Sequence, residues 1–193
     1  MFAEYVSIFF IFKKKEGKIM DKELLQHSID VSALATSIAY ELELCPYAVA
    51  EIAIAGLYHD IGKECLPKII LKKPSKLTDD EHKIMTFHTY IGNAILNMIN
   101  GEMSELVAEV ALNHHEYYDG TEYYKKKYDE VSLGTRIVTV ADVYSSLIND
   151  RVYRPAWSKE DALFYMQDNA GSLFDPTVVT ALLAALIKEQ ECI

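Results

Sequence analysis

The sequence contains few cysteines, and they do not follow the spacings that bind zinc or build disulfide frameworks. The 193 residues include three, at Cys45, Cys65 and Cys192, with no CxxC pair. An odd number at scattered positions argues against a disulfide-stabilised secreted protein and against a zinc ribbon. We therefore expect reduced thiols in a cytoplasmic protein.

Basic residues are also in deficit. Lysine and arginine total 19 against 29 aspartates and glutamates, which gives a formal net charge of −10 and a sequence pI of about 5.0. Because general nucleic-acid binding depends on a large basic surface, this balance excludes a protein that holds a nucleic acid polymer by electrostatics. A small anionic substrate would need locally placed cations or metal ions.

The apolar segment that opens the chain is too short to cross a membrane. It covers residues 1–12, whereas a transmembrane helix needs roughly 20 apolar residues. Basic residues follow it, although a signal peptide carries them first. Two interpretations stay open for the extension at 1–20: an interfacial anchor, or a native chain that starts at Met20. We expect no stable membrane insertion.

Strand patterns, internal repeats and low-complexity linkers are lacking, and helical periodicity takes their place. Half of the residues are hydrophobic, and they recur at three- and four-residue steps. The predicted fold is all-α, with a single domain over 21–193. We expect helices from residue 21 to the break at Pro46 and over 47–58, 78–98, 103–115, 133–148, 158–168 and 176–190, with a loop at 117–130. The helix over 47–58 is apolar nearly all round, so we expect it to be central and buried. Thr78 and Glu81 have the spacing of a capping box.

Ionisable residues interrupt two of the apolar helical segments. His59 and Asp60 follow the apolar run that ends at Tyr58, and Asp142 lies inside the helix predicted over 133–148. Any one histidine could be a surface residue or a satisfied core residue. Buried acids and histidines nevertheless cost free energy unless they are paired or bind a metal ion. Their combination therefore indicates a site.

Further nitrogen and oxygen donors accompany this pair. Glu23 and His27 are four residues apart and share a helix face, and His114 and His115 stand side by side before the loop. The set has no thiolate, which favours iron, manganese or a similar ion over structural zinc.

Four motifs resemble the HD superfamily of metal-dependent phosphohydrolases, and more closely its HD-GYP branch, the bacterial cyclic di-GMP phosphodiesterases. They are LYHDIGK at 57–63, HTYIGNAIL at 88–96, HHEYYDG at 114–120 and TVADVYSSLINDRVYR at 139–154. The resemblance extends over about residues 21–186. It implies a single helical HD domain around a buried metal cluster, which hydrolyses a cyclic dinucleotide, cyclic di-GMP first, with a metal-activated water.

The resemblance also implies which residues bind the metal ions. Asp60 would bridge two ions, and ions about 3.5–4 Å apart can share a water and activate it. A third ion would use Glu23, and iron or manganese is the expected metal. His82 has no role in this scheme and is predicted to lie on the surface. The ligands of the two-ion core would be His27, His59, Asp60, His88, His114, His115 and Asp142.

Substrate contacts are expected from basic residues near these motifs. Lys63 follows His59 by four residues, so one helical turn would direct it to the same site and to the scissile phosphate; a solvated lysine is the alternative. The resemblance adds Arg151 and Arg154 as contacts to the phosphates or bases of an anionic nucleotide. Their alternative role is a salt bridge with Asp150 or Glu160.

The chain departs from the HD-GYP pattern in the loop that gives the branch its name. Glu122, Tyr123 and Tyr124 stand in place of Gly-Tyr-Pro, so the backbone freedom of glycine and the rigidity of proline are both lost. Tyr123 remains a candidate substrate contact. Ser145 also replaces an acid in the long helix. Glu116 and Asp119 are expected to orient ligands or fix the loop.

Three hypotheses follow. In the first, Asp60 and Lys63 serve a phosphodiesterase that acts on cyclic di-GMP. In the second, the same site acts on another nucleotide or phosphoester because the loop has changed. In the third, the chain is a weakly catalytic binding or signalling module. The sequence specifies neither the metal nor the oligomeric state.

Overall fold

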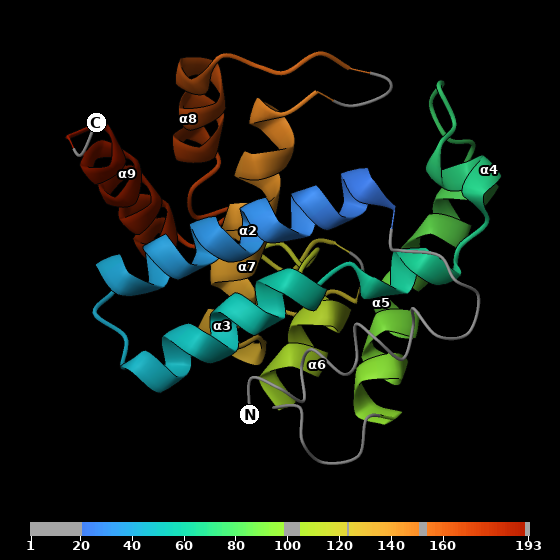
Figure 1. Cartoon of the computed structure of the whole chain (residues 1–193), viewed down its shortest axis with the longest axis horizontal. Coiled ribbons are helices and arrows are strands. Elements are labelled where there is room, and N and C mark those ends of the chain that lie inside the picture. The colour runs from blue at the N-terminus through green and yellow to red at the C-terminus, as the bar shows by residue number, and fades with distance from the viewer. Residues whose placement is uncertain (1–20, 99–104, 123, 151–153, 192–193) are drawn as a thin grey trace.

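The fold is helical throughout the part of the chain that the computed structural model describes, residues 21–98, 105–122, 124–150 and 154–191 (Figure 1). Within these ranges the β pairing is an isolated bridge between Ala170 and Phe174. The all-α prediction is therefore confirmed. The helices are α2 (Lys22–Glu41), α3 (Pro46–Tyr58), η1 (Ile61–Cys65), α4 (Lys68–Leu71), α5 (Asp79–Met98), α6 (Glu105–Asn113), η2 (Tyr128–Glu130), α7 (Leu133–Ile148), α8 (Lys159–Asp168) and α9 (Pro176–Glu191).

Local sequence signals explain where several helices begin. The capping box before α5 is confirmed, because the Thr78 amide donates to Glu81 Oε2 at 2.8 Å and the Glu81 amide donates back to Thr78 Oγ1 at 3.3 Å. Ser132 accepts from the Thr135 amide and so caps α7. Pro46 takes the first position of α3, where its missing N–H costs nothing.

Two predictions about the first helices need correction. The first helix ends at Glu41 instead of continuing to the break at Pro46, because Glu43 adopts a left-handed backbone with φ of 54°. The second helix, α3, is exposed at its start, at Pro46, Tyr47 and Ala50, whereas residues 51–58 are buried or partly buried. The central helix is instead α7, on which ten of 16 residues are buried.

The helices pack around α2 and α7, which cross near the middle of the molecule (Figure 1). Helix α2 contacts α3, α7 and α9, while α3 and α5 both pack on α6. Buried aliphatic side chains from α2 and α7, such as Ile38 and Ile137, join these layers in one core. Burial of apolar surface at about 25 cal/mol per Å² is the main force that holds such layers together.

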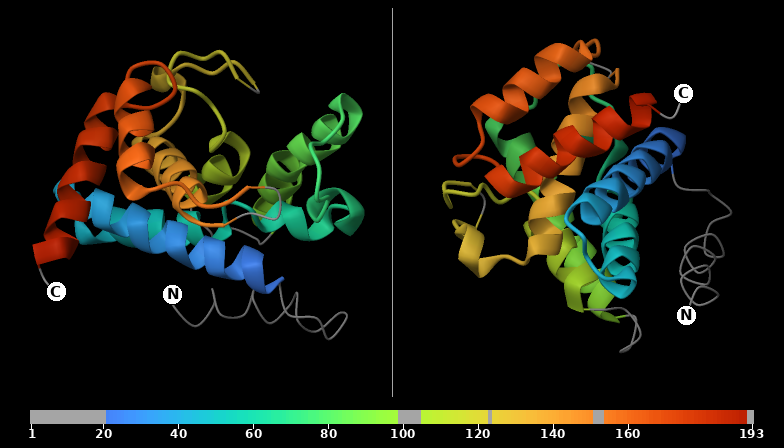
Figure 2. Two further views of the ribbon diagram at one scale, coloured as in Figure 1. Left: turned by 90° about the horizontal axis from the view of Figure 1, so that it is seen from above. Right: turned by 90° about the vertical axis from the view of Figure 1, so that its left-hand side faces the viewer.

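An arm made of α4 and the start of α5 projects to one side of this bundle (Figure 2). Among the described helices, none is both long and apolar enough to span a bilayer. The predicted extension at 1–20 lies outside the described residues, as do Tyr123, Arg151 and Cys192.

Candidate metal centre

Asp60 occupies the middle of a buried cluster of histidines. The chain leaves α3 through His59 and turns at Asp60 into the short 3-10 helix η1. Both residues are buried, with 0% of His59 and 1% of Asp60 exposed to solvent. Both side chains therefore lie in the interior where α3 ends and η1 begins.

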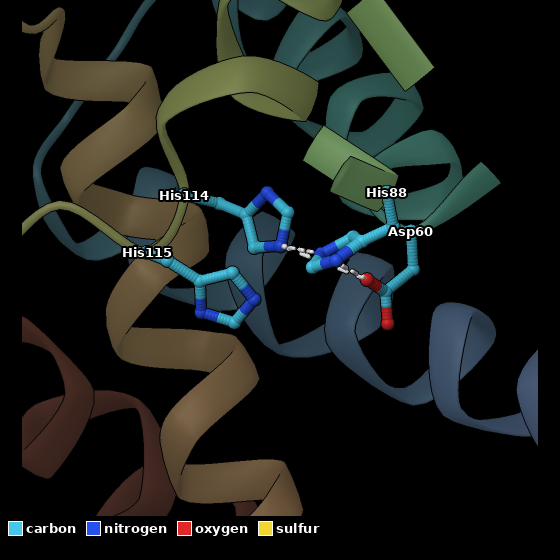
Figure 3. A group of neighbouring side chains, drawn as sticks. All are labelled: Asp60, His88, His114 and His115. Atoms are coloured by element: carbon cyan, nitrogen blue, oxygen red, sulfur yellow. Dashed lines mark hydrogen bonds and ion pairs between the residues drawn. The ribbon is translucent and has the colours of Figure 1, made fainter. Parts of the chain in front are cut away.

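The two carboxylate oxygens of Asp60 face different histidines. Oδ1 lies 3.3 Å from His88 Nε2 and 3.6 Å from His114 Nε2. Oδ2 lies 3.3 Å from His59 Nε2 and 4.0 Å from His27 Nε2. A carboxylate with one oxygen on each side is suited to bridge two cations. Figure 3 shows the Oδ1 side, with His88 from α5 and His114 and His115 from the end of α6.

Asp142 completes the side of the cluster that Oδ2 faces. It projects from α7, and its Oδ1 lies 2.9 Å from His27 Nε2 and 3.8 Å from His59 Nε2. The candidate ligand atoms form two groups, each with its members within 4.8 Å of one another. One group is Asp60, His88, His114 and His115, and the other is His27, His59 and Asp142.

Three histidines are oriented by backbone carbonyls of their own helices. Nδ1 of His59 lies 2.7 Å from the Gly56 carbonyl, that of His88 lies 2.7 Å from Met85, and that of His114 lies 3.0 Å from Val110. Because a carbonyl can only accept, each Nδ1 carries the proton and donates it. The opposite nitrogen, Nε2, is directed at the cluster, which is the usual arrangement of a metal-binding histidine.

Burial favours the neutral imidazole of two histidines, while nearby positive charge keeps the carboxylate of Asp60 ionised. Burial lowers the pKa of His88 to about 3 and lowers the pKa of His115 well below its usual range. Burial would raise the pKa of Asp60, but the charges of Lys63 and His59 hold that pKa well below its ordinary value. At neutral pH the centre therefore offers lone pairs and negative charge.

For His59, burial lowers the pKa, yet the charges of Asp60 and Asp142 outweigh it and the pKa is raised. The two carboxylates thus favour positive charge at a side chain that is fully buried.

The donor set fits divalent metal ions. His59 Nε2 and Asp60 Oδ1 are buried and have no hydrogen-bond partner within the described part of the chain. Because Nδ1 of His88 donates its proton to the Met85 carbonyl, the His88 Nε2 can only accept. This Nε2 and Asp60 Oδ1 are therefore two acceptors 3.3 Å apart. Unpaired buried acceptors cost about 1–3 kcal/mol each, and a cation between them removes that cost.

Lys63 lies at the edge of this centre and Glu23 lies outside it. The Lys63 ammonium contacts Asp60 Oδ2 at 2.5 Å. Its position agrees with the expectation that it points to the site, although the turn is a 3-10 helix, η1.

Glu23 is exposed in the first turn of α2 and belongs to neither ligand group. A third ion at Glu23 stays a prediction. His82 is exposed, as predicted.

The Arg154 side chain contacts the end of α7 and a neighbouring tryptophan. Its guanidinium donates to the carbonyl of Ser146 at 2.7 Å and lies 5.6 Å from the centre of the Trp157 ring. Its contact with a substrate stays a prediction.

Ser145 is buried, and its hydroxyl has no hydrogen-bond partner among the described residues.

The loop after His115 is fixed to the bundle at its base. Tyr118 stacks on Tyr128 with ring centres 4.7 Å apart, and the Tyr118 amide donates to the Leu173 carbonyl. Asp119 accepts from the backbone and side chain of Thr121. Of the two roles expected for Glu116 and Asp119, their contacts agree with fixing the loop, because Glu116 also accepts backbone N–H groups.

Sequence reasoning missed two residues that contact or approach the candidate ligands. Thr139, one turn before Asp142 on α7, donates to the His114 carbonyl at 2.8 Å. Gly62 lets η1 lie against α5, since a Cβ at this position would be 1.9 Å from the His88 carbonyl oxygen. A glycine two residues after Asp60 was the available signal for the close approach.

Comparison with known proteins identifies the family and several relatives of the chain. A family model described as HD domain matches residues 13–178. A cyclic di-GMP phosphodiesterase of Pseudomonas aeruginosa is 39% identical over 88% of this chain and 41% of its own length. A 3'3'-cGAMP-specific phosphodiesterase of Vibrio cholerae is 35% identical over 88% of this chain and 37% of its own length.

A solved structure supports the fold independently of sequence. An HDG"Y"P protein from Bdellovibrio bacteriovorus superposes with a TM-score of 0.71 at 16% identity, over 84% of this chain and 52% of that one. Relative to the two phosphodiesterases compared above, the chain spans about two fifths of their length. Because the family model matches residues 13–178, most of this chain, the chain belongs to the HD domain family.

Proposed function

We propose that this chain is a metal-dependent phosphodiesterase that hydrolyses a cyclic dinucleotide, with cyclic di-GMP as the first candidate substrate. The observation that carries the proposal is the division of seven ligands into two groups on opposite oxygens of Asp60. This arrangement suits a pair of metal ions, and the named activities of the relatives supply the substrate class.

Iron or manganese is the proposed metal, because every donor is a nitrogen or an oxygen. When bound, a metal pair lowers the pKa of a water and neutralises charge on phosphate oxygens. The residues of the chain hold the ions and shape the pocket: Asp60 joins the two ligand groups, and backbone carbonyls fix the histidine rings.

Lys63 is the proposed contact to the scissile phosphate. Its ammonium already lies against Asp60, and about a quarter of its side chain is exposed. A cation that is partly open to solvent beside the ligands can bind an entering phosphate oxygen. In the overall reaction water attacks phosphorus, the ribose 3' oxygen leaves, and the product is a linear dinucleotide.

A different cyclic dinucleotide, such as 3'3'-cGAMP, is the second candidate. Two observations favour it: the Glu122–Tyr124 departure in the loop beside His115, and the 35% identity to a 3'3'-cGAMP-specific relative. The two candidates share the metal chemistry and differ only in the bases that the pocket receives.

One experiment tests the function. The protein is purified without oxygen, stripped of metal, and reloaded with iron, manganese or zinc. Each form is then given cyclic di-GMP, 3'3'-cGAMP, cyclic di-AMP and a simple aryl phosphodiester. We expect hydrolysis of a cyclic dinucleotide that a chelator abolishes. Cleavage of the aryl ester alone would favour another phosphoester substrate, and a fully metallated but inert protein would favour a binding module.

A further inference from the structure

A carboxylate next to the metal ligands binds the backbone of the altered loop. Glu116 directly follows His115 and is 5% exposed. Its Oε1 accepts the amide of Tyr124 at 2.7 Å, and its Oε2 accepts the amide of Lys126 at 3.0 Å. Charge-assisted bonds from two backbone amides to one buried carboxylate are stronger than neutral ones. They fix residues 124–126 to the end of α6.

Two further contacts connect the same short segment with neighbours of other ligands. The Tyr124 hydroxyl lies 2.9 Å from Thr89 Oγ1, and Thr89 follows His88. Thr89 already donates to the Thr86 carbonyl, so the tyrosine hydroxyl is the donor between them. The Lys126 ammonium donates to the side chain of Asn113, which precedes His114. Three residues adjacent to three ligands thus hold one segment.

This arrangement depends on the departure from Gly-Tyr-Pro. Tyr124 stands where the HD-GYP signature has proline, and proline has no N–H to donate to Glu116. Proline also lacks the hydroxyl that reaches Thr89. Both the Oε1 bond and the contact to α5 therefore belong to this chain's own residue at position 124.

We infer that Glu116 is a positioning residue that holds Tyr124 beside the metal centre, where the Tyr124 ring contacts the nucleotide part of the substrate. The ring is tethered at both its backbone and its hydroxyl, yet 44% of the residue is exposed. A fixed aromatic surface open to solvent suits packing on a base or a ribose. The substrate contact rests on the proposed function; the hold on the loop does not.

The test uses the metal-loaded protein and four variants. Glu116→Ala removes both bonds, and Glu116→Gln keeps one acceptor oxygen in a side chain of the same shape. Tyr124→Phe removes the hydroxyl alone. Glu130→Gln is the control, because Glu130 also accepts a loop amide, that of Lys127, but from an exposed position.

Trypsin reports on the loop without any substrate, because Lys125, Lys126 and Lys127 lie in it. We expect cleavage in Glu116→Ala to be about tenfold faster than in the parent, since local opening limits proteolysis. Glu116→Gln should be intermediate and Glu130→Gln close to the parent. Metal content should be unchanged in all four. Cleavage of both Glu116 variants at the parental rate would overturn the hold on the loop, and loss of metal would show that Glu116 acts on the ligands.

Kinetics then separate substrate binding from chemistry. For the dinucleotide that the parent hydrolyses, we expect Glu116→Ala and Tyr124→Phe to raise KM about three- to tenfold with little change in kcat. A faster-cut loop with unchanged KM would overturn the substrate contact. If the parent hydrolyses no dinucleotide, the proposed function fails and the substrate contact with it, while the trypsin comparison still decides the role of Glu116.

Discussion

At the scale of single residues, Asp60 carries the largest share of the proposed chemistry. It is the one described side chain whose two oxygens face both ligand groups. Replacement by alanine leaves each group without its shared oxygen, so we expect Asp60→Ala to lose most bound metal. Activity should fall by at least about a thousandfold, since metal ions supply several kcal/mol of transition-state stabilisation.

Metal analysis and turnover measure this outcome together. Asp80→Ala is the control, because Asp80 is an exposed aspartate that pairs with Lys83 on the surface of α5. An Asp60→Ala protein that kept both its metal and its activity would contradict the bridging role.

For Glu23 we expect a much smaller loss of metal than for Asp60. It is exposed and lies outside both ligand groups, so the two-ion core does not depend on it. Glu23→Ala should lower metal content by no more than about one ion and leave the helix intact, because a first-turn charge contributes only about 0.3–1 kcal/mol. Lys22→Ala is the neighbouring control. Complete loss of metal would mean that the core ligands are assigned wrongly.

At the scale of secondary-structure elements, the contact between η1 and α5 sets the distance between Asp60 and His88. A Cβ at Gly62 would lie 1.9 Å from the His88 carbonyl oxygen and 2.7 Å from the Gly92 amide nitrogen. Gly62→Ala should therefore push η1 away from α5, destabilise the protein by about 3 kcal/mol and weaken metal binding.

Gly92 offers a matched control on the facing helix. Its Cβ would meet its neighbours at 3.4 Å or more, which is ordinary contact, so Gly92→Ala should change stability by less than about 1 kcal/mol. Chemical denaturation and metal titration of the two variants give the comparison. Equal stability of Gly62→Ala and Gly92→Ala would show that η1 can move without loss.

The same elements show what the sequence could and could not predict. Periodicity placed the helices, and the motifs pointed to seven residues that the structure brings together. The end of α2 was missed because a positive φ at Glu43 has no periodic signature. The exposed start of α3 was missed because an apolar sequence does not say how many neighbours a helix has. The bonds from Glu116 and Thr139 join distant segments and could not be read from local spacing.

At the scale of the whole molecule, the candidate ligands come from α2, α5, α7 and the ends of α3 and α6. Ions held by these residues would connect five helices, so their removal should destabilise the complete fold. Metal at a hundred times its dissociation constant contributes about 2.7 kcal/mol. For a domain of this size each kcal/mol shifts Tm by about 2–4 °C, so chelation should lower Tm by roughly 5–10 °C.

Thermal unfolding of the loaded and the chelated protein measures this shift. Asp60→Ala serves as the internal control, because a protein that cannot hold the ions should not respond to the chelator. An unchanged Tm in the parent after verified metal removal would mean that the ions do not link the helices.

The order of the ligands along the chain has a consequence for biosynthesis. His27 leaves the ribosome first and Asp142 last of the seven, with more than a hundred positions between them. Translation at about 5–20 residues per second separates the two by on the order of ten seconds. During that interval the nascent chain holds histidines without their acidic partner on α7, so it cannot retain a metal pair in its final form. Metal loading should therefore follow synthesis of nearly the entire domain, and the supply of metal ions to the newly released protein would set how much of it becomes active.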